Sequence, residues 1–463
     1  MIEVHEYRDK SVAVLGLGSS GMAAARALAA GGAKVLSWDD DVAKREASGT
    51  HSLTFADLYK TDFSDVAALV LSPGIPLTHP QPHRVVQRAR AAGCPVIGDM
   101  ELFAGAVVGP SVVGVTGTNG KSTTTALVGH LLETSGRSVA VGGNLGKPAL
   151  DLPELDDEGI YVLELSSFQI DLAPSLVCDI AVLLNLSPDH LDRHGDMAGY
   201  IAVKKRLLLQ QAPRGIAVIA TDDPDCETVF KELKSEHRQR IVEVGIGHVI
   251  EGGVYVIEGV LHDATDDRVP SFDLSNAESL MGVHNWQNAA AAIAVVRMLG
   301  LPADRAMQGL VSFPGLPHRL EQVATIEGVR FVNDSKATNA AAAARALATF
   351  DNIHWIAGGI AKAGGIESLS PYFPRIARAY LIGEASTGFA ATLGDRVAHT
   401  SCVDLTSAIA AAFDDAQARP GGSVVLLSPA CASFDQWPNF EARGDDFRGQ
   451  VRALANRDRG APC

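Results

Sequence analysis

A glycine-rich turn at residues 114–125 constrains the fold of this chain more than any other segment. The apolar run 111–115 predicts a buried strand before the turn, and residues 126–132 predict a helix after it. Such a turn cradles phosphate, because backbone N–H groups and the helix dipole both favour an anion. Lys121 adds a positive charge, and Ser122 stands where such loops hold the magnesium of a nucleotide. The turn therefore predicts binding of ATP or GTP, through Gly117, Thr118, Asn119, Gly120, Lys121, Ser122 and Thr123.

The glycines of this turn depart from the general phosphate-loop pattern. That pattern has a glycine where this chain has Val115. A chance cluster of glycines is the alternative, and the Gly-Lys-Ser-Thr run at a strand-to-helix junction argues against it. We therefore expect a phosphate loop of a particular subtype.

The order of apolar strand, glycine turn and amphipathic helix recurs along the chain, which predicts an α/β fold with mainly parallel sheets. With 463 residues, the chain is too long for one hydrophobic core. Pro314 and Pro317 mark a linker. We therefore expect three domains, at residues 1–99, 100–314 and 315–463.

Composition excludes several classes of protein. A net charge of −15 disfavours binding to nucleic acid. Membrane insertion is not expected, because no apolar run is long enough to span a bilayer. The N-terminal residues lack the features of a signal peptide, which favours a cytoplasmic location. The six cysteines are scattered without a C-x-x-C pair, which argues against a disulfide framework or structural zinc.

A second glycine turn, G-x-G-x-x-G at residues 16–21, follows a predicted strand at 11–15. Asp39 follows about twenty positions later, as in a dinucleotide-binding fingerprint. A nicotinamide-dependent oxidoreductase is therefore one interpretation. The diphosphate of another nucleotide fits equally well, because the pattern requires only a phosphate at a helix N-terminus. The turn 72–76, after a predicted strand at 66–71, is either a further ligand contact or a plain tight turn.

Polar side chains follow two apolar runs of the central segment. Glu164 lies in the run 160–169, which predicts a buried strand, so its carboxylate should be paired or should bind metal. With Ser122, it is a candidate magnesium ligand; a salt bridge is the alternative. The run 179–192 brings Asp189, His190 and Asp192 to a strand end, where His190 is either a ligand of a second metal ion or structural.

Lys204 and Lys205 lie on a predicted helix at 198–211, where a solvated basic face is the default interpretation. In the third segment, the runs 333–339 and 428–437 each follow a predicted strand. Asp334 and Ser335 could simply cap the next helix. The combination of Asp334, Lys336 and Thr338 at one strand tip instead suggests a site, and both runs are predicted to face one crevice.

Six motifs in order resemble the Mur ligases of peptidoglycan synthesis, over essentially the whole chain. They are residues 117–123, 164–169, His284-Asn285-x-x-Asn288, Leu316-Pro317-His318-Arg319, 333–339 and 428–433. The last two motifs resemble the member of the family that adds D-glutamate. The phosphate loop alone would not decide the substrate, because related ATP-dependent amide ligases such as folylpolyglutamate synthase share it.

The resemblance implies a Rossmann-like UDP-binding domain, a central P-loop ATPase domain and a Rossmann-like C-terminal domain. It implies an ATP-dependent ligase that joins D-glutamate to UDP-N-acetylmuramoyl-L-alanine through an acyl phosphate, and that acts as a monomer. The turn 16–21 would then hold the diphosphate of the UDP-sugar.

Site residues follow from the same resemblance. The implied catalytic residues are Lys121, His190, Lys204 and Lys336. Two Mg²⁺ ions are implied, one on Ser122 and Glu164 and one on His190 and a carbamylated Lys204. The further ATP contacts are Asn288, Arg319 and Asp334. The UDP-substrate contacts are Leu17, Ser19, Ser20, Asp39, Ser72, Gly74 and Asn144. The D-glutamate contacts are Thr338, Lys362, Ser433 and Phe440.

Two positions depart from the family pattern. Asp41 stands where the family often has a basic residue, and Ile360-Ala361 precede Lys362 where the family often has an acidic residue. The contacts of this chain with UDP and with D-glutamate are therefore expected to differ in detail.

Overall fold

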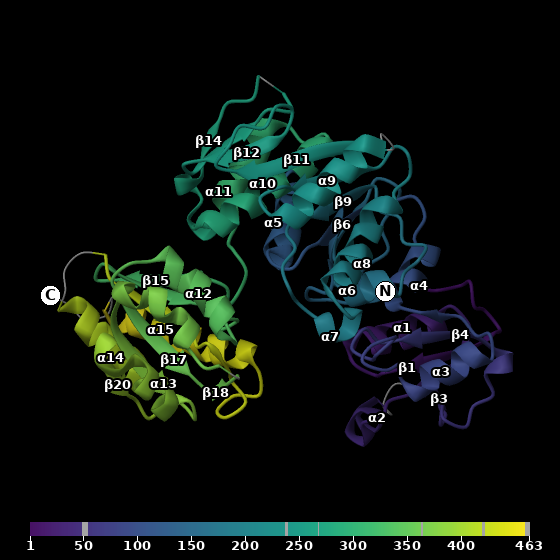
Figure 1. Ribbon diagram of the computed structural model, residues 1–463, viewed down its shortest axis with the longest axis horizontal. Helices are drawn as coiled ribbons and strands as arrows, with labels where there is room; N and C mark the ends of the chain where they lie inside the picture. Colours follow the sequence, from purple (N-terminus) through teal and green to yellow (C-terminus); the bar gives the residue numbers. More distant parts are fainter. Residues whose placement is uncertain (49–53, 237–238, 267, 363, 419–421, 459–463) are drawn as a thin grey trace. The chain divides into compact units, whose positions relative to one another are not determined.

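The computed structural model describes residues 1–48, 54–236, 239–266, 268–362, 364–418 and 422–458 (Figure 1). These residues form two compact units, and each is an α/β structure. The first unit holds residues 1–277 and 283–313, and the second holds residues 278–282 and 314–463. No helix in the described ranges is both long and apolar enough to cross a membrane.

The first unit begins with a five-stranded parallel sheet in the order β3-β2-β1-β4-β5. Its strands are β1 (Ser11–Leu15), β2 (Lys34–Trp38), β3 (Thr54–Phe55), β4 (Val66–Leu71) and β5 (Val96–Ile97). Its helices are α1 (Ser19–Ala30), α2 (Val42–Ser48), α3 (Arg84–Ala91) and α4 (Asp99–Ala106). The strand predicted at 11–15 is confirmed as β1, and the turn 16–21 runs from the end of β1 into the first residues of α1.

A nine-stranded sheet follows in the same unit, in the order β14-β13-β12-β11-β10-β9-β6-β8-β7. The parallel part comprises β6 (Ser111–Thr116), β7 (Val139–Gly143), β8 (Ile160–Glu164), β9 (Ile180–Leu183), β10 (Ile216–Ala220), β11 (Arg240–Ile246) and β12 (Val254–Ile257). β13 (Val260–Asp263) and β14 (Phe272–Asp273) add an antiparallel edge. The helices are α5 (Lys121–Thr134), α6 (Ser167–Asp171), α7 (Leu191–His194), α8 (Met197–Leu209), α9 (Pro224–Glu236), α10 (Val283–Met298) and α11 (Ala303–Ser312).

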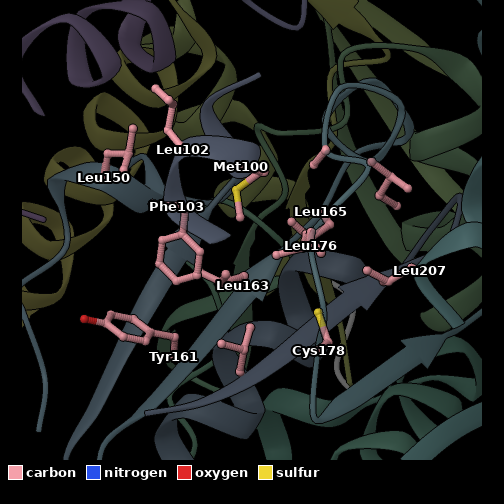
Figure 2. Packing of buried hydrophobic residues seen from close by; sticks show 14 of the residues in the cluster. Met100, Leu102, Phe103, Leu150, Tyr161, Leu163, Leu165, Leu176, Cys178 and Leu207 are labelled. Carbon is pink, nitrogen blue, oxygen red and sulfur yellow. The ribbon is translucent and has the colours of Figure 1, made fainter. Parts of the chain in front are cut away.

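The two sheets of the first unit share one hydrophobic core. The cluster that contains Val12 and Val14 of β1 also contains Leu163 of β8. Helix α4 lies at the junction, and Figure 2 shows Phe103 beside Tyr161, with ring centroids 5.2 Å apart. This continuous packing fixes the N-terminal sheet against the central sheet.

The second unit has a six-stranded sheet in the order β15-β16-β21-β17-β19-β20. Its strands are β15 (Glu321–Ile326), β16 (Val329–Asn333), β17 (Ile353–Gly358), β19 (Ile376–Ile382), β20 (His399–Ser401) and β21 (Val424–Leu427). All pairings are parallel except that of β15 with β16. β18 (Ile360–Ala361) pairs with β22 (Cys431–Ala432), and the helices are α12 (Ala340–Thr349), α13 (Ser386–Leu393), α14 (Leu405–Gln417) and α15 (Phe440–Asp458).

One predicted element is wrong in part. The run 160–169 was expected to form a single strand, but β8 ends at Glu164 and α6 begins at Ser167. The cause is a capping box, in which Ser166 Oγ accepts from the Gln169 backbone N–H and the Gln169 side chain accepts from the Ser166 backbone N–H. Glu164 is thereby placed at the carboxyl end of its strand rather than in the middle.

Candidate active site

The phosphate loop, residues 117–123, connects β6 to α5 and needs its glycines. Gly120 has φ of +83°, and a Cβ atom there would lie 2.2 Å from Asn288 Oδ1. Gly117 has φ of +146°, and a Cβ there would come within 3.0 Å of Leu184 Cβ. Lys121 Nζ spans the loop and donates to the carbonyls of Gly117 and Thr118, at 3.0 and 2.8 Å. The loop therefore has its backbone close to neighbouring elements and a cation across it.

Asn185, directly after β9, holds this loop in place, and the sequence analysis did not single it out. Its carbonyl accepts from Thr118 N at 2.8 Å, and its Oδ1 accepts from Asn119 N at 2.8 Å. Its Nδ2 donates to the Asn119 carbonyl and to Gln287 Oε1 of α10, both at 3.1 Å. The sequence feature that could have indicated Asn185 is its position at the end of a buried strand.

Asn288, a predicted ATP contact, lies on α10 against the start of α5. Its Oδ1 accepts from Thr124 Oγ1 at 3.2 Å, and its Nδ2 donates to Asn285 Oδ1 at 3.1 Å. Asn288 is 2% exposed, so this pairing fixes its side chain beside the phosphate loop.

Glu164 is 3% exposed at the end of β8, next to β6 in the sheet. Asn144 Nδ2 donates to its Oε1 at 2.7 Å, whereas its Oε2 is buried with no hydrogen-bond partner among the described residues. A buried carboxylate oxygen without a partner is costly, which fits a cation ligand. The described part of the chain holds no group of three or more His, Cys, Asp or Glu side chains that could bind a metal ion by themselves. One or two carboxylates together with substrate phosphates are the ligands that Mg²⁺ takes in nucleotide sites, and Glu164 beside the phosphate loop is a carboxylate of this kind.

The burial of Lys204 contradicts the default interpretation that this side chain lies on a solvated basic face. It is 1% exposed, and its Nζ donates to Thr116 Oγ1 at 3.2 Å and to the Gly117 carbonyl at 2.9 Å. The face of α8 that carries it packs on the phosphate loop, which the helix sequence alone does not reveal. Lys205, one residue on, ion-pairs with Glu232 at the surface.

Burial, together with the positive charge of Lys121, lowers the pKa of Lys204 to about 7. At neutral pH, a large fraction of this side chain is therefore a neutral amine. A neutral amine is a nucleophile, whereas an ammonium is not.

His190 lies before α7 in a left-handed conformation with φ of +53°. Its side chain is 48% exposed, its Nε2 lies 3.4 Å from Asp189 Oδ2, and its ring lies 4.7 Å from that of Phe168. The ring nitrogens are thus accessible to a ligand at the carboxyl edge of the central sheet.

The turn 16–21 and the turn 72–76 meet at the edge of the N-terminal sheet. Leu17 N donates to Asp39 Oδ2 at 2.7 Å, and Ser72 Oγ donates to the Gly16 carbonyl at 2.8 Å. A Cβ on Gly16 would lie 2.6 Å from Ser72 Cβ, so the approach requires glycine. Ser19 and Gly74 are exposed, and Ser20 is half-buried. The predicted UDP contacts other than Asn144 therefore lie in one region.

In the second unit, the runs 333–339 and 428–437 lie side by side, as predicted, because β16 and β21 are parallel neighbours. Ser428 Oγ donates to Asp334 Oδ2 at 2.8 Å. Burial raises the pKa of Asp334 to about 7, although the bond from Ser428 favours the carboxylate. Lys336 Nζ lies 4.0 Å from the centroid of the Phe440 ring.

The other predicted residues of the second unit differ in exposure. Ser433 is buried, Thr338 and Arg319 are half-buried, and Lys362 is exposed. Buried Arg443 was missed by the sequence analysis; it donates to Ser335 Oγ and to the carbonyls of Ser335 and Cys431, and so joins the two runs. The predicted nucleotide contacts are divided between the units, since Asn288 belongs to the first and Arg319 and Asp334 to the second.

Three family models match the chain. They are the Mur ligase MurD-like N-terminal domain at residues 10–98, the Mur ligase middle domain at 115–296 and the Mur ligase glutamate ligase domain at 318–431. Curated proteins are similar over nearly the full length. The UDP-N-acetylmuramoylalanine–D-glutamate ligase of Caulobacter sp. (strain K31) is 52% identical over 98% of each chain. The protein of the same name from Phenylobacterium zucineum is 50% identical over 98% of this chain and 99% of its own.

Solved structures show the same three-domain fold. The UDP-N-acetylmuramate-alanine ligase of Thermotoga maritima aligns with a TM-score of 0.60 at 16% identity, over 96% of this chain and 99% of that one. A UDP-N-acetylmuramoyl-L-alanyl-D-glutamate–2,6-diaminopimelate ligase aligns with a TM-score of 0.57 at 20% identity, over 85% and 94%.

Proposed function

Because the chain belongs to the Mur ligase family, we propose that it joins D-glutamate to UDP-N-acetylmuramoyl-L-alanine with hydrolysis of ATP to ADP and phosphate. The observation that carries the proposal is the full-length identity of about half with ligases of that name. The phosphate loop with Glu164 and Lys204 at one sheet edge supplies the chemistry such a reaction requires.

The reaction proceeds in two steps. A carboxylate is a poor electrophile, so ATP first phosphorylates the alanyl carboxylate of the UDP-substrate to an acyl phosphate and releases ADP. The amine of D-glutamate then attacks the acyl carbon, and the tetrahedral intermediate expels phosphate as the amide forms. Both steps develop negative charge on oxygen, so positioned cations supply most of the catalysis.

Residues of the phosphate loop and of the elements next to it have separate roles in this reaction. Lys121 contacts the γ-phosphate, and Ser122 with Glu164 holds one Mg²⁺. When bound, the metal neutralises charge on the phosphoryl oxygens and orients them. Asn144 donates to Glu164 and so fixes the rotamer of that carboxylate.

Lys204 becomes a carbamate in this proposal. Its neutral amine attacks the carbon of CO2, an N–C bond forms as one C–O π bond of CO2 opens, and one proton leaves to solvent, which converts the neutral amine into an anion. The pKa of about 7 supports this step, because the attacking form is populated at neutral pH. The carbamate and His190 would hold the second Mg²⁺.

The remaining residues of the proposal bind the substrates. The turn 16–21 holds the diphosphate of the UDP-substrate rather than a nicotinamide cofactor, with Asp39, Ser72 and Gly74 nearby. In the second unit, Arg319, Asp334 and Lys336 serve the nucleotide. Thr338, Lys362, Ser433 and Phe440 serve D-glutamate.

We place the enzyme in the cytoplasm, where its nucleotide substrates occur, and we propose that it acts as a monomer. Light scattering at assay concentration gives the mass directly, and a dimer would contradict the second statement.

Phosphate release with ATP, Mg²⁺ and UDP-N-acetylmuramoyl-L-alanine tests the function, with each amino acid supplied in turn. D-Glutamate should support turnover, and L-glutamate should not. Turnover with a different amino acid but not with D-glutamate would refute the proposal.

A further inference from the structure

Arg193 of α7 makes a contact that neither the sequence motifs nor the proposed reaction uses. Its guanidinium donates to three backbone carbonyls of the turn 72–76, from Nη1 to Gly74 at 2.9 Å and from Nη2 to Pro73 at 3.3 Å and Ile75 at 2.8 Å. The turn belongs to the N-terminal sheet, whereas α7 belongs to the central sheet. One side chain therefore joins the two sheets beside the proposed UDP-substrate site.

The other side of Arg193 contacts the region of His190. The guanidinium carbon lies 4.5 Å from the centroid of the Phe168 ring, and that ring lies 4.7 Å from the ring of His190. His194 stacks on the same ring at 5.5 Å, and its Nε2 lies 2.9 Å from Ser167 Oγ. Phe168 therefore contacts both Arg193 and His190, and these contacts connect the turn 72–76 to the proposed metal ligand.

The guanidinium suits this contact better than an ammonium would. Its planar fork reaches several acceptors at once while its face stacks on an aromatic ring, and lysine offers a point charge without either feature. Arg193 is half-buried, so its bonds to the turn are partly shielded from water.

We propose that Arg193 is a positioning residue, which fixes the turn 72–76 relative to His190 and so sets where the alanyl carboxylate of the UDP-substrate meets the γ-phosphate. This inference rests on the proposed function. The UDP end of the substrate binds at the two turns, and its carboxylate reacts near His190, so the separation of these two places must match the length of the substrate. A displacement of about 1 Å between reacting groups can cost on the order of a hundredfold in rate.

Arg26 provides a matched control. It also joins the N-terminal sheet to the central segment, because its Nη2 donates to both carboxylate oxygens of Asp151, at 2.9 and 2.7 Å. It lies on α1, and none of its described bonds involves the turn 72–76. Arg26→Ala therefore reports the loss of a bridging arginine without loss of the turn contact.

The experiment compares Arg193→Ala, Arg193→Lys and Arg26→Ala in the full-length ligase assay. Arg193→Ala should raise the KM for the UDP-substrate and lower kcat, each by about tenfold, and leave the KM for ATP within about twofold. Arg193→Lys should recover part of the loss. Arg26→Ala should leave both KM values within about twofold, because general destabilisation removes active enzyme without changing KM.

Hydrogen exchange supplies a readout that does not depend on activity. The Ile75 amide donates to the Ser72 carbonyl at 3.0 Å within the turn, so its exchange reports turn order. It should exchange faster in Arg193→Ala than in wild type and be unchanged in Arg26→Ala. Unchanged exchange with an unchanged KM for the UDP-substrate would overturn the inference, whereas a wild-type protein that does not use this substrate would overturn the proposed function instead.

Discussion

Two buried titratable side chains, one in each unit, have pKa values near neutrality for the same physical reason. Burial disfavours the charged form, so it lowers the pKa of the Lys204 ammonium and raises that of the Asp334 carboxyl, each to about 7. Buried groups whose pKa values are shifted toward neutrality are candidates for catalytic chemistry. A substitution of Lys204 or of Asp334 therefore tests the role of that one side chain.

Replacing Lys204 by alanine should reduce ligase activity by about a thousandfold or more, because the proposed carbamate ligand of Mg²⁺ is lost. Short carboxylates such as acetate or formate should restore part of the activity by taking the place of the carbamate. Lys205→Ala, on the same helix but paired with Glu232 at the surface, is the control and should retain activity. Near-wild-type activity of Lys204→Ala would contradict the assigned role.

Replacing Asp334 by asparagine should change how stability depends on pH. The pKa of Asp334 is about 7 in the folded protein, above its ordinary value of 3.8, so the folded state holds a proton that the unfolded state releases. The free energy of unfolding should therefore fall as pH rises from about 4 to about 7, by on the order of a few kcal/mol from this group.

Urea unfolding at several pH values measures this slope. Asp334→Asn should flatten it, whereas Asp351→Asn, at a carboxylate whose side chain is 82% exposed, should leave it as in wild type. An equal slope in Asp334→Asn and wild type would show that burial of Asp334 is not its source.

At the scale of elements, α5 has a glycine at each end with nearly the same backbone conformation and very different surroundings. Gly120 precedes the helix with φ of +83°, and Gly136 follows it with φ of +84°. A Cβ at Gly120 would lie 2.2 Å from Asn288 Oδ1, whereas a Cβ at Gly136 would meet nothing within 4 Å. A comparison of alanine variants at the two positions therefore separates the effect of backbone strain from the effect of disturbing the phosphate loop.

Gly136→Ala should cost about 1–2 kcal/mol of stability from the left-handed conformation and leave the KM for ATP unchanged. Gly120→Ala carries the same strain and also displaces Asn288 or the loop, so we expect at least a tenfold weaker affinity for ATP. Calorimetric titration with ATP measures the difference. Equal affinities in the two variants would contradict the assigned role of the loop.

The sequence predicted elements better than it predicted contacts. The strand predicted at 66–71 has the same bounds as β4, because a buried parallel strand is a continuous apolar segment. Glu164 could be singled out because a carboxylate next to such a run needs a partner. The burial of Lys204 depends on which face of α8 packs on a loop more than eighty residues away, and no local pattern encodes that.

Asn185 and Arg193 were missed for the same reason. Their partners, Asn119 and the turn 72–76, lie 66 residues and more than a hundred residues away in the sequence. The family resemblance supplied the roles of the matched residues, and it supplied nothing about these bridging contacts. Tertiary geometry was needed to find them.

At the scale of the whole molecule, a shared core joins the N-terminal and central sheets, and the remaining residues form a second unit. The turns proposed for the UDP-substrate and the phosphate loop thus lie on one packed body. The residues proposed to bind D-glutamate lie on the other unit. In the proposed reaction, the acyl phosphate forms before the amino acid attacks it.

The proposed reaction makes one amide bond for each ATP consumed. The most direct test is mass spectrometry of the nucleotide-sugar product alongside phosphate release, with D-glutamate in one reaction and L-glutamate in the other. We predict one molecule of UDP-N-acetylmuramoyl-L-alanyl-D-glutamate for each phosphate with D-glutamate, and no product with L-glutamate. Phosphate release without the amide product, or equal product from L-glutamate, would contradict the account.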